Sequence, residues 1–273
     1  MSWLSRTELL IGPEGLDLLN QAHVLVIGLG GVGSFAAEFI ARSGVGEMTI
    51  VDGDVVDPSN RNRQLPALAT THGLSKADLM AERLLSINPD LKLHVRKDFL
   101  SPEACREILT QPFAYVMDCI DSITPKLTLL ATAHEKGYRI ISSMGAGGKL
   151  DPTQVQVADL FDTKSCTLAH YVRKRLRRYG IQSGIKAVYS TELVRTDSLM
   201  HTDGSNFKRS AYGTISYLPA TFGAVCASVV IRDLLHEPIE DYEASQLETR
   251  KRQRLEREAY FRKQAKIAAR KKD

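Results

Sequence analysis

Residues 23–33 read His-Val-Leu-Val-Ile-Gly-Leu-Gly-Gly-Val-Gly, and this stretch decides the fold of the 273-residue chain. A short apolar run leads into a glycine-rich turn, and apolar residues at helical spacing follow it. Glycine permits a tight turn and lets phosphate groups approach backbone N–H groups at the positive end of a helix. We therefore expect Gly28, Gly30 and Gly33 to form a dinucleotide-type phosphate-binding turn.

Strand-like and helix-like stretches alternate outward from this turn to about residue 148. Further apolar strands are predicted at 47–51, 91–95, 114–117 and 139–143, and Ser75 and Ser101 are typical helix caps. This alternation predicts an α/β, Rossmann-like fold with a doubly wound, mostly parallel sheet.

The chain is predicted to be organised in three parts. We expect residues 1–148 to be the nucleotide-binding half, and residues 149–237 to be a more irregular substrate-binding and dimerisation half of the same domain. Residues 238–273 read as a charged, basic helical tail. Within the second half, we expect a strand at 155–157, a basic helix at 170–179 and a loop at 205–213.

The composition argues against a secreted, disulfide-linked or membrane-spanning protein. The first seven residues lack the layout of a signal peptide, and the apolar segment 218–231 is shorter than the roughly 20 residues needed to span a bilayer. We expect this segment to be a buried core helix. The four cysteines form no CxxC pair, which argues against a zinc site and indicates a reducing cytoplasm.

Positive charge is concentrated in two places. The net charge is +4, yet residues 249–273 alone hold eleven Lys or Arg against three Asp or Glu. A polarised chain of this kind indicates a polyanionic partner. The second concentration is the helix 170–179, which offers phosphate contacts or, as the alternative, an ordinary solvated face. Its basic residues are Arg173, Lys174, Arg175, Arg177 and Arg178.

An acid follows at the position where a ribose would lie. Asp52 ends the second predicted strand, 19 residues after Gly33, and can accept hydrogen bonds from ribose hydroxyls. The glycines and this acid alone fit an NAD-dependent oxidoreductase equally well.

Cations and amides beyond Asp52 favour ATP chemistry instead. Fixed cations lower the barrier for displacement at an α-phosphate, because negative charge builds on the departing pyrophosphate. Arg63 and Lys76 are therefore predicted to be catalytic, with Asn60 and Gln64 binding the phosphates and ordering their loop. An NAD-dependent enzyme would leave these two cations without a use.

Two further acids follow the strand predicted at 114–117. Asp118 and Asp121 lie at the carboxyl edge of the sheet, where ligands bind in open α/β folds. Since Mg²⁺ takes few protein carboxylates beside phosphate oxygens, we expect Asp121 to be the metal ligand and Asp118 to shape the loop of the nucleotide site. Helix capping is the alternative role of Asp121.

The motifs GLGGVG (28–33), NRNRQ (60–64) and DCID (118–121) resemble those of the ubiquitin-activating/ThiF/MoeB/HesA superfamily of adenylating enzymes. Within it, the runs 143–160, 189–192 and 213–223 resemble the family of tRNA threonylcarbamoyladenosine dehydratases. Sulfur-carrier and ubiquitin-activating relatives usually carry CxxC zinc motifs, a catalytic cysteine or both. Here Cys166 is the cysteine nearest to where such a nucleophile would lie, and we read it as a small buried residue.

The resemblance implies ATP and Mg²⁺ as cofactors and a homodimer. It implies that Arg6 is donated to the partner's ATP, although Thr7 stands where the family usually has Gln. It implies a tRNA that carries threonylcarbamoyladenosine as partner, not DNA, with sulfur-transfer proteins as further partners. The residues implied to line the ATP site are Gly31, Asp52, Asp54, Asn60, Arg63, Lys76 and Asp121.

The reaction so implied is an ATP-dependent dehydration. The threonylcarbamoyl carboxylate is adenylated with release of pyrophosphate, and ring closure then releases AMP, without an enzyme cysteine because the nucleophile is already tethered. Two alternatives remain at this point. One is an adenylyltransferase for the C-terminus of a small sulfur-carrier or ubiquitin-like protein. The other is an RNA-binding protein whose nucleotide fold no longer reacts.

Overall fold

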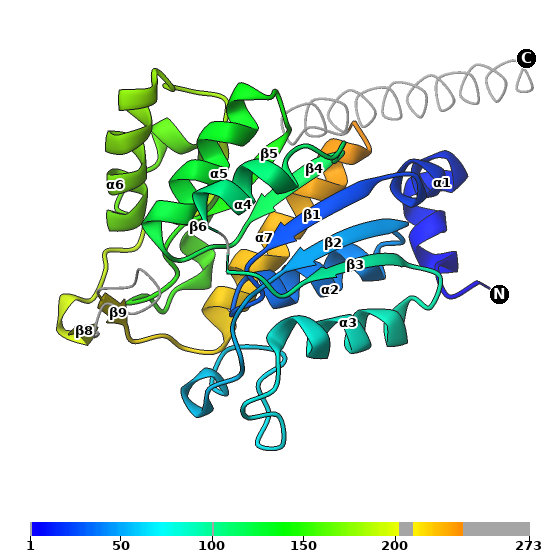
Figure 1. Ribbon diagram of the computed structural model, residues 1–273, viewed down its shortest axis with the longest axis horizontal. Helices are drawn as coiled ribbons and strands as arrows, with labels where there is room; N and C mark the ends of the chain where they lie inside the picture. Colours follow the sequence, from blue (N-terminus) through cyan, green and yellow to red (C-terminus); the bar gives the residue numbers. More distant parts are fainter. Residues whose placement is uncertain (1, 100, 202–209, 237–273) are drawn as a thin grey trace, which may run out of the picture. The chain divides into compact units, whose positions relative to one another are not determined.

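The computed structural model describes residues 2–99, 101–201 and 210–236 (Figure 1). Residues 1–234 form one compact unit, to which the following description applies. The predicted basic tail 238–273 and most of the predicted loop 205–213 lie outside the described residues.

A seven-stranded sheet with the order β3-β2-β1-β4-β5-β7-β6 forms the centre of this unit. Every neighbouring pair is parallel except β6 and β7, which are antiparallel. The predicted α/β class with a mostly parallel sheet is confirmed. The strands are β1 (His23–Ile27), β2 (Glu47–Val51), β3 (Lys92–Arg96), β4 (Tyr115–Asp118), β5 (Ile140–Ser143), β6 (Val155–Asp159) and β7 (Lys186–Ser190).

Helices cover both faces of the sheet (Figure 1). Helices α2 and α7 pack against each other on one face, and α4 and α5 pack against each other on the opposite face. Leu25 and Ile27 of β1 belong to the core cluster with α4 and α5, so the alternating Val24 and Val26 face the other side. The helices are α1 (Ser5–Asn20), α2 (Gly33–Arg42), α3 (Lys76–Ile87), α4 (Pro102–Ile108), α5 (Ile123–Glu135), α6 (Thr167–Leu176) and α7 (Tyr217–Leu234).

The helix starts predicted from the capping residues agree with the structure. The Ser75 hydroxyl accepts from the Asp78 N–H at the start of α3, and the Ser101 hydroxyl accepts from the Ala104 N–H at the start of α4. Each serine satisfies a backbone donor that the first turn of a helix leaves unpaired. Single turns of 3-10 helix lie at Pro58–Asn60, Pro152–Gln154, Leu160–Asp162, Arg177–Tyr179 and Thr196–Ser198.

The loop predicted for residues 205–213 needs a correction. Ser210–Tyr212 is strand β9, which pairs antiparallel with β8 (Leu199–His201). Three residues are too few to show the alternation that marks a strand, and the pairing partner precedes them by about ten positions. The structure therefore replaces the end of the predicted loop by a short ribbon.

The apolar segment 218–231 lies in α7, and it is a core helix as expected. The 18 residues of α7 have a mean hydropathy of 1.3, so by length and composition this helix could cross a membrane. Half of the helix is nevertheless buried inside the fold. Leu218, Phe222, Cys226 and Val230 recur every four residues and are all buried. This periodic burial is what a helix packed on a sheet requires.

Candidate active site

The glycine turn between β1 and α2 leaves no room for a side chain at Gly28 or Gly33. A Cβ atom at Gly28, where φ is +88°, would lie 2.9 Å from the carbonyl oxygen of Cys119. A Cβ at Gly33 would lie 1.7 Å from the carbonyl oxygen of Gly28. The turn therefore folds tightly onto the loop after β4, and it leads directly into α2, whose amino end attracts anions.

Asp52, which directly follows β2, is tied to this turn. Its carboxylate accepts from the Leu29 N–H at 2.6 Å and from the Asp54 N–H at 2.8 Å. Burial raises the pKa of Asp52, and the nearby Lys76 opposes that shift. Each carboxylate oxygen still has a lone pair for a ribose hydroxyl. The acid can therefore order the turn and contact a nucleotide at once.

Lys76 is held at the start of α3 by Asp54, a partner 22 residues earlier in the chain. Its ammonium lies 3.0 Å from the carboxylate of Asp54, and its backbone N–H donates to the Asp54 carbonyl at 3.1 Å. The lysine side chain is almost fully buried, whereas that of Asp54 is 42% exposed. The pair fixes a positive charge beside Asp52, as phosphate binding requires.

The NRNRQ segment forms a compact turn around Asn60. The buried Asn60 side chain accepts from the Asp57 N–H at 3.1 Å, and Asp57 in turn caps the short helix through Ser59. The Asn60 carbonyl accepts the N–H groups of Arg63 and Gln64 at 3.1 and 2.9 Å. Asn60 therefore builds the loop that presents its two neighbours.

Arg63 is oriented by hydrogen bonds within the same turn. Its Nη1 donates to the Ser59 carbonyl and to the Asn62 Oδ1, both at 2.9 Å. Partial burial lowers the pKa of Arg63, and the charges of Asp121 and Asp57 oppose this. Asp121, exposed in the loop after β4, therefore lies near Arg63, so the structure brings the predicted cation and the predicted metal ligand together.

Gln64 supplies an observation that fits a bound nucleotide. Its Oε1 is buried and has no hydrogen-bond partner among the residues that the structure describes. Its amide lies against the turn, since a Cβ at Gly30 would be 3.7 Å from the Gln64 Nε2. An unpaired buried acceptor is costly, so it favours a ligand that donates to it.

Asp118 lies in the interior, at the carboxyl end of β4. Its Oδ2 accepts from the Lys126 ammonium and from the Ser142 hydroxyl, both at 2.5 Å, and its Oδ1 accepts from the Ile120 N–H at 3.1 Å. Asp118 and Lys126 are both fully buried. This arrangement ties the loop after β4 to the core and leaves the Asp118 carboxylate out of direct reach of solvent, while its part in the nucleotide site stays a prediction. Sequence reasoning did not identify Lys126.

Arg6 is not among the groups gathered at the nucleotide turn. It is exposed on α1, and Leu16 of this helix and the preceding Leu4 pack on Gly44, just before β2 begins. The groups of the ATP site follow the carboxyl ends of β1, β2 and β4, whereas Gly44 lies at the amino end of β2. Within one chain the structure therefore does not join Arg6 to Arg63.

The basic helix α6 and the turn that follows it are only partly engaged within the chain. Arg173 donates to the Thr163 carbonyl at 3.0 Å, and the Arg177 guanidinium lies 5.6 Å from the centre of the Phe161 ring. The remaining members of the cluster, Lys174, Arg175 and Arg178, are exposed. Their charges are therefore available to an external anion.

Three of the four cysteines are poor nucleophiles in this environment. Burial raises the pKa of Cys105 to about 12, and it also raises the pKa values of Cys119 and Cys226. Cys166 is buried where α6 begins. Since the thiolate is the reactive form, Cys105, Cys119 and Cys226 stay unreactive thiols at neutral pH.

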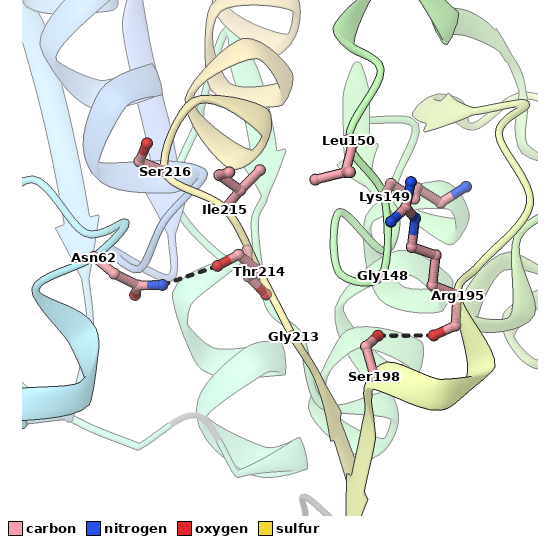
Figure 2. A pocket seen from close by; sticks show the side chains of 10 residues that line it. All are labelled: Asn62, Gly148, Lys149, Leu150, Arg195, Ser198, Gly213, Thr214, Ile215 and Ser216. Carbon is pink, nitrogen blue, oxygen red and sulfur yellow. Dashed lines mark hydrogen bonds between the residues drawn. The ribbon is translucent and has the colours of Figure 1, made fainter.

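A cavity of about 480 Å³ opens beside the turn of Asn62 (Figure 2). Asn62 borders it on one side and donates to the Thr214 carbonyl at 2.8 Å, while Lys149 and Arg195 lie on the opposite side. Because Asn62 also accepts from Arg63, the cavity adjoins the phosphate site. The lining residues are Asn62, Gly148, Lys149, Leu150, Arg195, Ser198, Gly213, Thr214, Ile215 and Ser216.

Much of the wall of this cavity comes from residues 148–150 and 213–216. Both segments belong to the runs that resemble the dehydratase family, but no role in the site was predicted for them from the sequence. The Glu192 carboxylate accepts the N–H groups of Leu150 and Asp151 at 2.9 and 2.8 Å. The buried Lys149 ammonium donates to the carbonyls of Ser190 and Glu192. These bonds tie the segment that follows Gly148 to the end of β7 and the residues just after it.

The ThiF family model matches residues 4–271 of the chain. The chain belongs to the ThiF family. The superfamily resemblance predicted from the glycine turn, the Asn-Arg turn and the loop after β4 is confirmed. This ThiF-family chain is 39% identical over 240 residues to the tRNA threonylcarbamoyladenosine dehydratase of Bacillus subtilis (strain 168), covering 85% of this chain and 94% of that one.

A solved relative shows the same fold with ATP present. The crystal structure of Escherichia coli tRNA N6-threonylcarbamoyladenosine dehydratase in complex with ATP matches with a TM-score of 0.78 and 36% identity, over 86% of this chain and 94% of that one. The adenylyltransferase and sulfurtransferase uba4 of Aspergillus niger is 35% identical over 133 residues, only 49% of this ThiF-family chain and 27% of the other. The dehydratases are thus similar over nearly their whole length.

Proposed function

We propose that the chain catalyses the ATP-dependent dehydration of threonylcarbamoyladenosine beside the anticodon of tRNA. The observation that carries this is the junction at Asn62, whose amide bonds both to Arg63 of the phosphate site and to Thr214 of the adjoining cavity. A carboxylate in the cavity can thereby meet an α-phosphate at Arg63. The similarity to tRNA threonylcarbamoyladenosine dehydratases over 85% of the chain supports this substrate.

The reaction proceeds in two balanced steps. An oxygen of the threonyl carboxylate attacks the α-phosphorus of ATP, a new O–P bond forms, and the bond to the β-phosphate breaks with release of pyrophosphate. A nitrogen or oxygen of the same modification then attacks the activated carbonyl, loses its proton and displaces AMP. AMP carries away the carboxylate oxygen, so the net change in the nucleoside is the loss of one water.

Side chains of this chain stabilise the charge that develops in the first step. Arg63 and Lys76 place fixed positive charge at the phosphates, and Gln64 offers its unpaired acceptor to a donor of the nucleotide. The raised pKa values of Cys119 and Cys226, together with the burial of Cys166, support a route without a covalent cysteine intermediate. An intramolecular nucleophile makes such an intermediate unnecessary.

Mg²⁺ fits this site as a second charge-stabilising group. It prefers hard oxygen ligands and takes few protein carboxylates, and the exposed carboxylate of Asp121 lies near Arg63 at the carboxyl edge of the sheet. When bound, the ion supplies electrostatic stabilisation of the phosphate oxygens. Asp121 would hold it.

The cavity is assigned to the threonylcarbamoyl group. Of the two cations that line it within the described residues, Lys149 already donates to backbone carbonyls, which leaves Arg195 to recognise the substrate. We expect Arg195→Gln to raise KM for the tRNA by about tenfold to a hundredfold, because a hydrogen bond to a charged group contributes about 1.5–3 kcal/mol. Initial rates over a range of tRNA concentrations measure this.

Arg106→Gln is the matched control for Arg195→Gln. It removes the same charge from the surface of α4, where Arg106 pairs with Glu103 at 3.8 Å. Such an exposed pair contributes little to stability, so this variant should keep the parental KM. Equal KM values for the two variants would argue against the assignment of the cavity.

We further propose that tRNA lies along the basic helix and that a second copy of the chain completes the ATP site. The exposed Lys174, Arg175 and Arg178 suit a phosphate backbone. Arg6 shares one stretch of α1 with Leu9 and Leu10, which are 87% and 85% exposed, and such an apolar surface suits a homodimer that brings Arg6 to its partner's ATP. A cytoplasmic location follows from a tRNA substrate. A sulfur-transfer partner stays a prediction.

The decisive experiment is mass spectrometry of nucleosides from threonylcarbamoylated tRNA after incubation with the protein, Mg²⁺ and ATP. We expect the modified adenosine to lose the mass of one water only when ATP is present. An unchanged nucleoside, with protein that exchanges pyrophosphate on the C-terminus of a small sulfur-carrier protein, would assign the chain to that alternative instead. The first result would identify the modified nucleoside as the group that is adenylated, and the second would identify a protein C-terminus.

A further inference from the structure

A second cluster of ligand-bearing side chains lies at the other end of the sheet. His23 begins β1, Glu47 begins β2, and His94 lies in β3. The parallel register pairs His23 with Glu47, and it pairs Thr49 with His94. Since residues two apart in a strand share a face, all three side chains project from the same face of three neighbouring strands.

The potential ligand atoms of these residues converge on one point. One nitrogen of each imidazole and one oxygen of the carboxylate all lie within 4.8 Å of one another, and within the described part of the chain this is the one such group of three. The His94 Nε2 lies 2.7 Å and the His23 Nδ1 lies 3.6 Å from the same Glu47 Oε1. Small shifts of these side chains would place one ion between them.

The orientation of His23 suits a metal ligand. Its Nε2 lies 2.8 Å from the Thr49 hydroxyl, which leaves Nδ1 directed toward Glu47. A second hydrogen bond of this kind fixes the tautomer of most metal-bound histidines. The Phe113 ring packs edge-on at 4.6 Å and holds the imidazole in place.

We propose that His23, Glu47 and His94 bind one divalent transition-metal ion of the zinc type, with His23 coordinating through Nδ1. Two imidazoles and one carboxylate, with a fourth position for water, form a known zinc ligand set. Mg²⁺ prefers oxygen ligands and is disfavoured here. This site is separate from the proposed ATP and Mg²⁺ site, which follows the opposite ends of the same strands.

Lys92 competes with the metal in this arrangement. Its ammonium lies 2.9 Å from the Glu47 Oε1 and occupies the charge-compensating position. The Lys92 side chain is 66% exposed, so it can turn into solvent when an ion arrives. The ion would join the three neighbouring strands β1, β2 and β3 near the ends at which they begin, and its role would be to stabilise that end of the sheet.

Cobalt(II) binding to the untagged full-length chain tests the proposal. After chelator treatment and dialysis, we expect the protein to bind one Co²⁺ per chain, with the intense visible absorption of a four-coordinate site, and Zn²⁺ to displace it. His94→Gln and Glu47→Gln should each weaken binding at least about tenfold, because even indirect partners of a metal ligand contribute that much. A large excess of Mg²⁺ should not displace the cobalt.

Two further variants separate this site from other metal-binding residues. His170→Gln removes an exposed histidine on α6 and should leave Co²⁺ affinity unchanged. Lys92→Met removes the competing ammonium without removing a ligand, so it should tighten binding. Unaltered Co²⁺ affinity in His94→Gln, Glu47→Gln and Lys92→Met would show that the cluster is a plain hydrogen-bonding network, as would the absence of Co²⁺ binding by the parent.

Discussion

Arg63→Ala is expected to lower the rate of substrate-dependent ATP–pyrophosphate exchange by about a hundredfold to a thousandfold, the usual effect of removing one preorganised donor from a developing negative charge. The Arg63 guanidinium is held by the Ser59 carbonyl and the Asn62 side chain before any substrate binds. Little reorganisation is therefore needed when the α-phosphate is attacked. Exchange of labelled pyrophosphate into ATP, with threonylcarbamoylated tRNA present, measures the effect.

The neighbouring Arg61→Ala provides the matched control. Arg61 is exposed in the same turn, and its backbone N–H donates to the Pro58 carbonyl, so truncation of its side chain leaves the fold of the turn intact. We expect Arg61→Ala to exchange pyrophosphate at close to the parental rate. An equal loss in both variants would point to a disturbed loop and against a specific role of Arg63.

Lys126→Met should destabilise the protein by about 3–5 kcal/mol, because it leaves the carboxylate of Asp118 buried without a counter-charge. The lysine also donates to the Ser143 carbonyl at 3.0 Å, which would lose its partner as well. The free energy of unfolding from urea denaturation, followed by circular dichroism, measures this effect.

Two comparison variants show whether the loss of stability in Lys126→Met comes from the unpaired buried charge. The double variant Asp118→Asn/Lys126→Met removes both charges and should recover part of the stability, since no unpaired ion stays in the core. Lys97→Met breaks an exposed pair with Asp78 and should cost no more than about 1 kcal/mol. If Lys126→Met were as stable as Lys97→Met, the buried pair would not be a determinant of the fold.

The central part of the fold follows from the sequence because its signals are local. The strands 23–27 and 47–51 were predicted with the bounds that the structure shows, since each is an apolar run closed by a turn. The glycine turn, the acid at residue 52 and the caps of α3 and α4 likewise depend on residues close in the chain. The first helix and β7 were not predicted, and the pairing of β8 with β9 joins residues that no local pattern connects.

The site was only partly predictable for the same reason. Asn60 and Arg63 could be identified because they lie in one short polar segment, and Lys76 because it stands at the predicted start of a helix capped by Ser75. The burial of Lys126 depends on Asp118 and Ser142 from two neighbouring strands, so nothing in its own helix indicates it. The cavity is bounded by segments around 62, 149, 195 and 214, which are brought together only by the completed fold.

The close packing of α7 has a consequence for how the two substrates are aligned. A Cβ at Gly223 would lie 2.5 Å from the Val32 carbonyl oxygen, and one at Gly31 would lie 3.0 Å from Pro219, so this helix rests directly on the nucleotide turn. The same helix begins just after the residues 214–216 that border the cavity. In the proposed function, the spacing between carboxylate and phosphorus would thus be set by a single packed element. The conformational entropy of ordering the protein groups that align the reactants is then lost when the chain folds, so binding has to offset only the entropy that the substrates themselves lose.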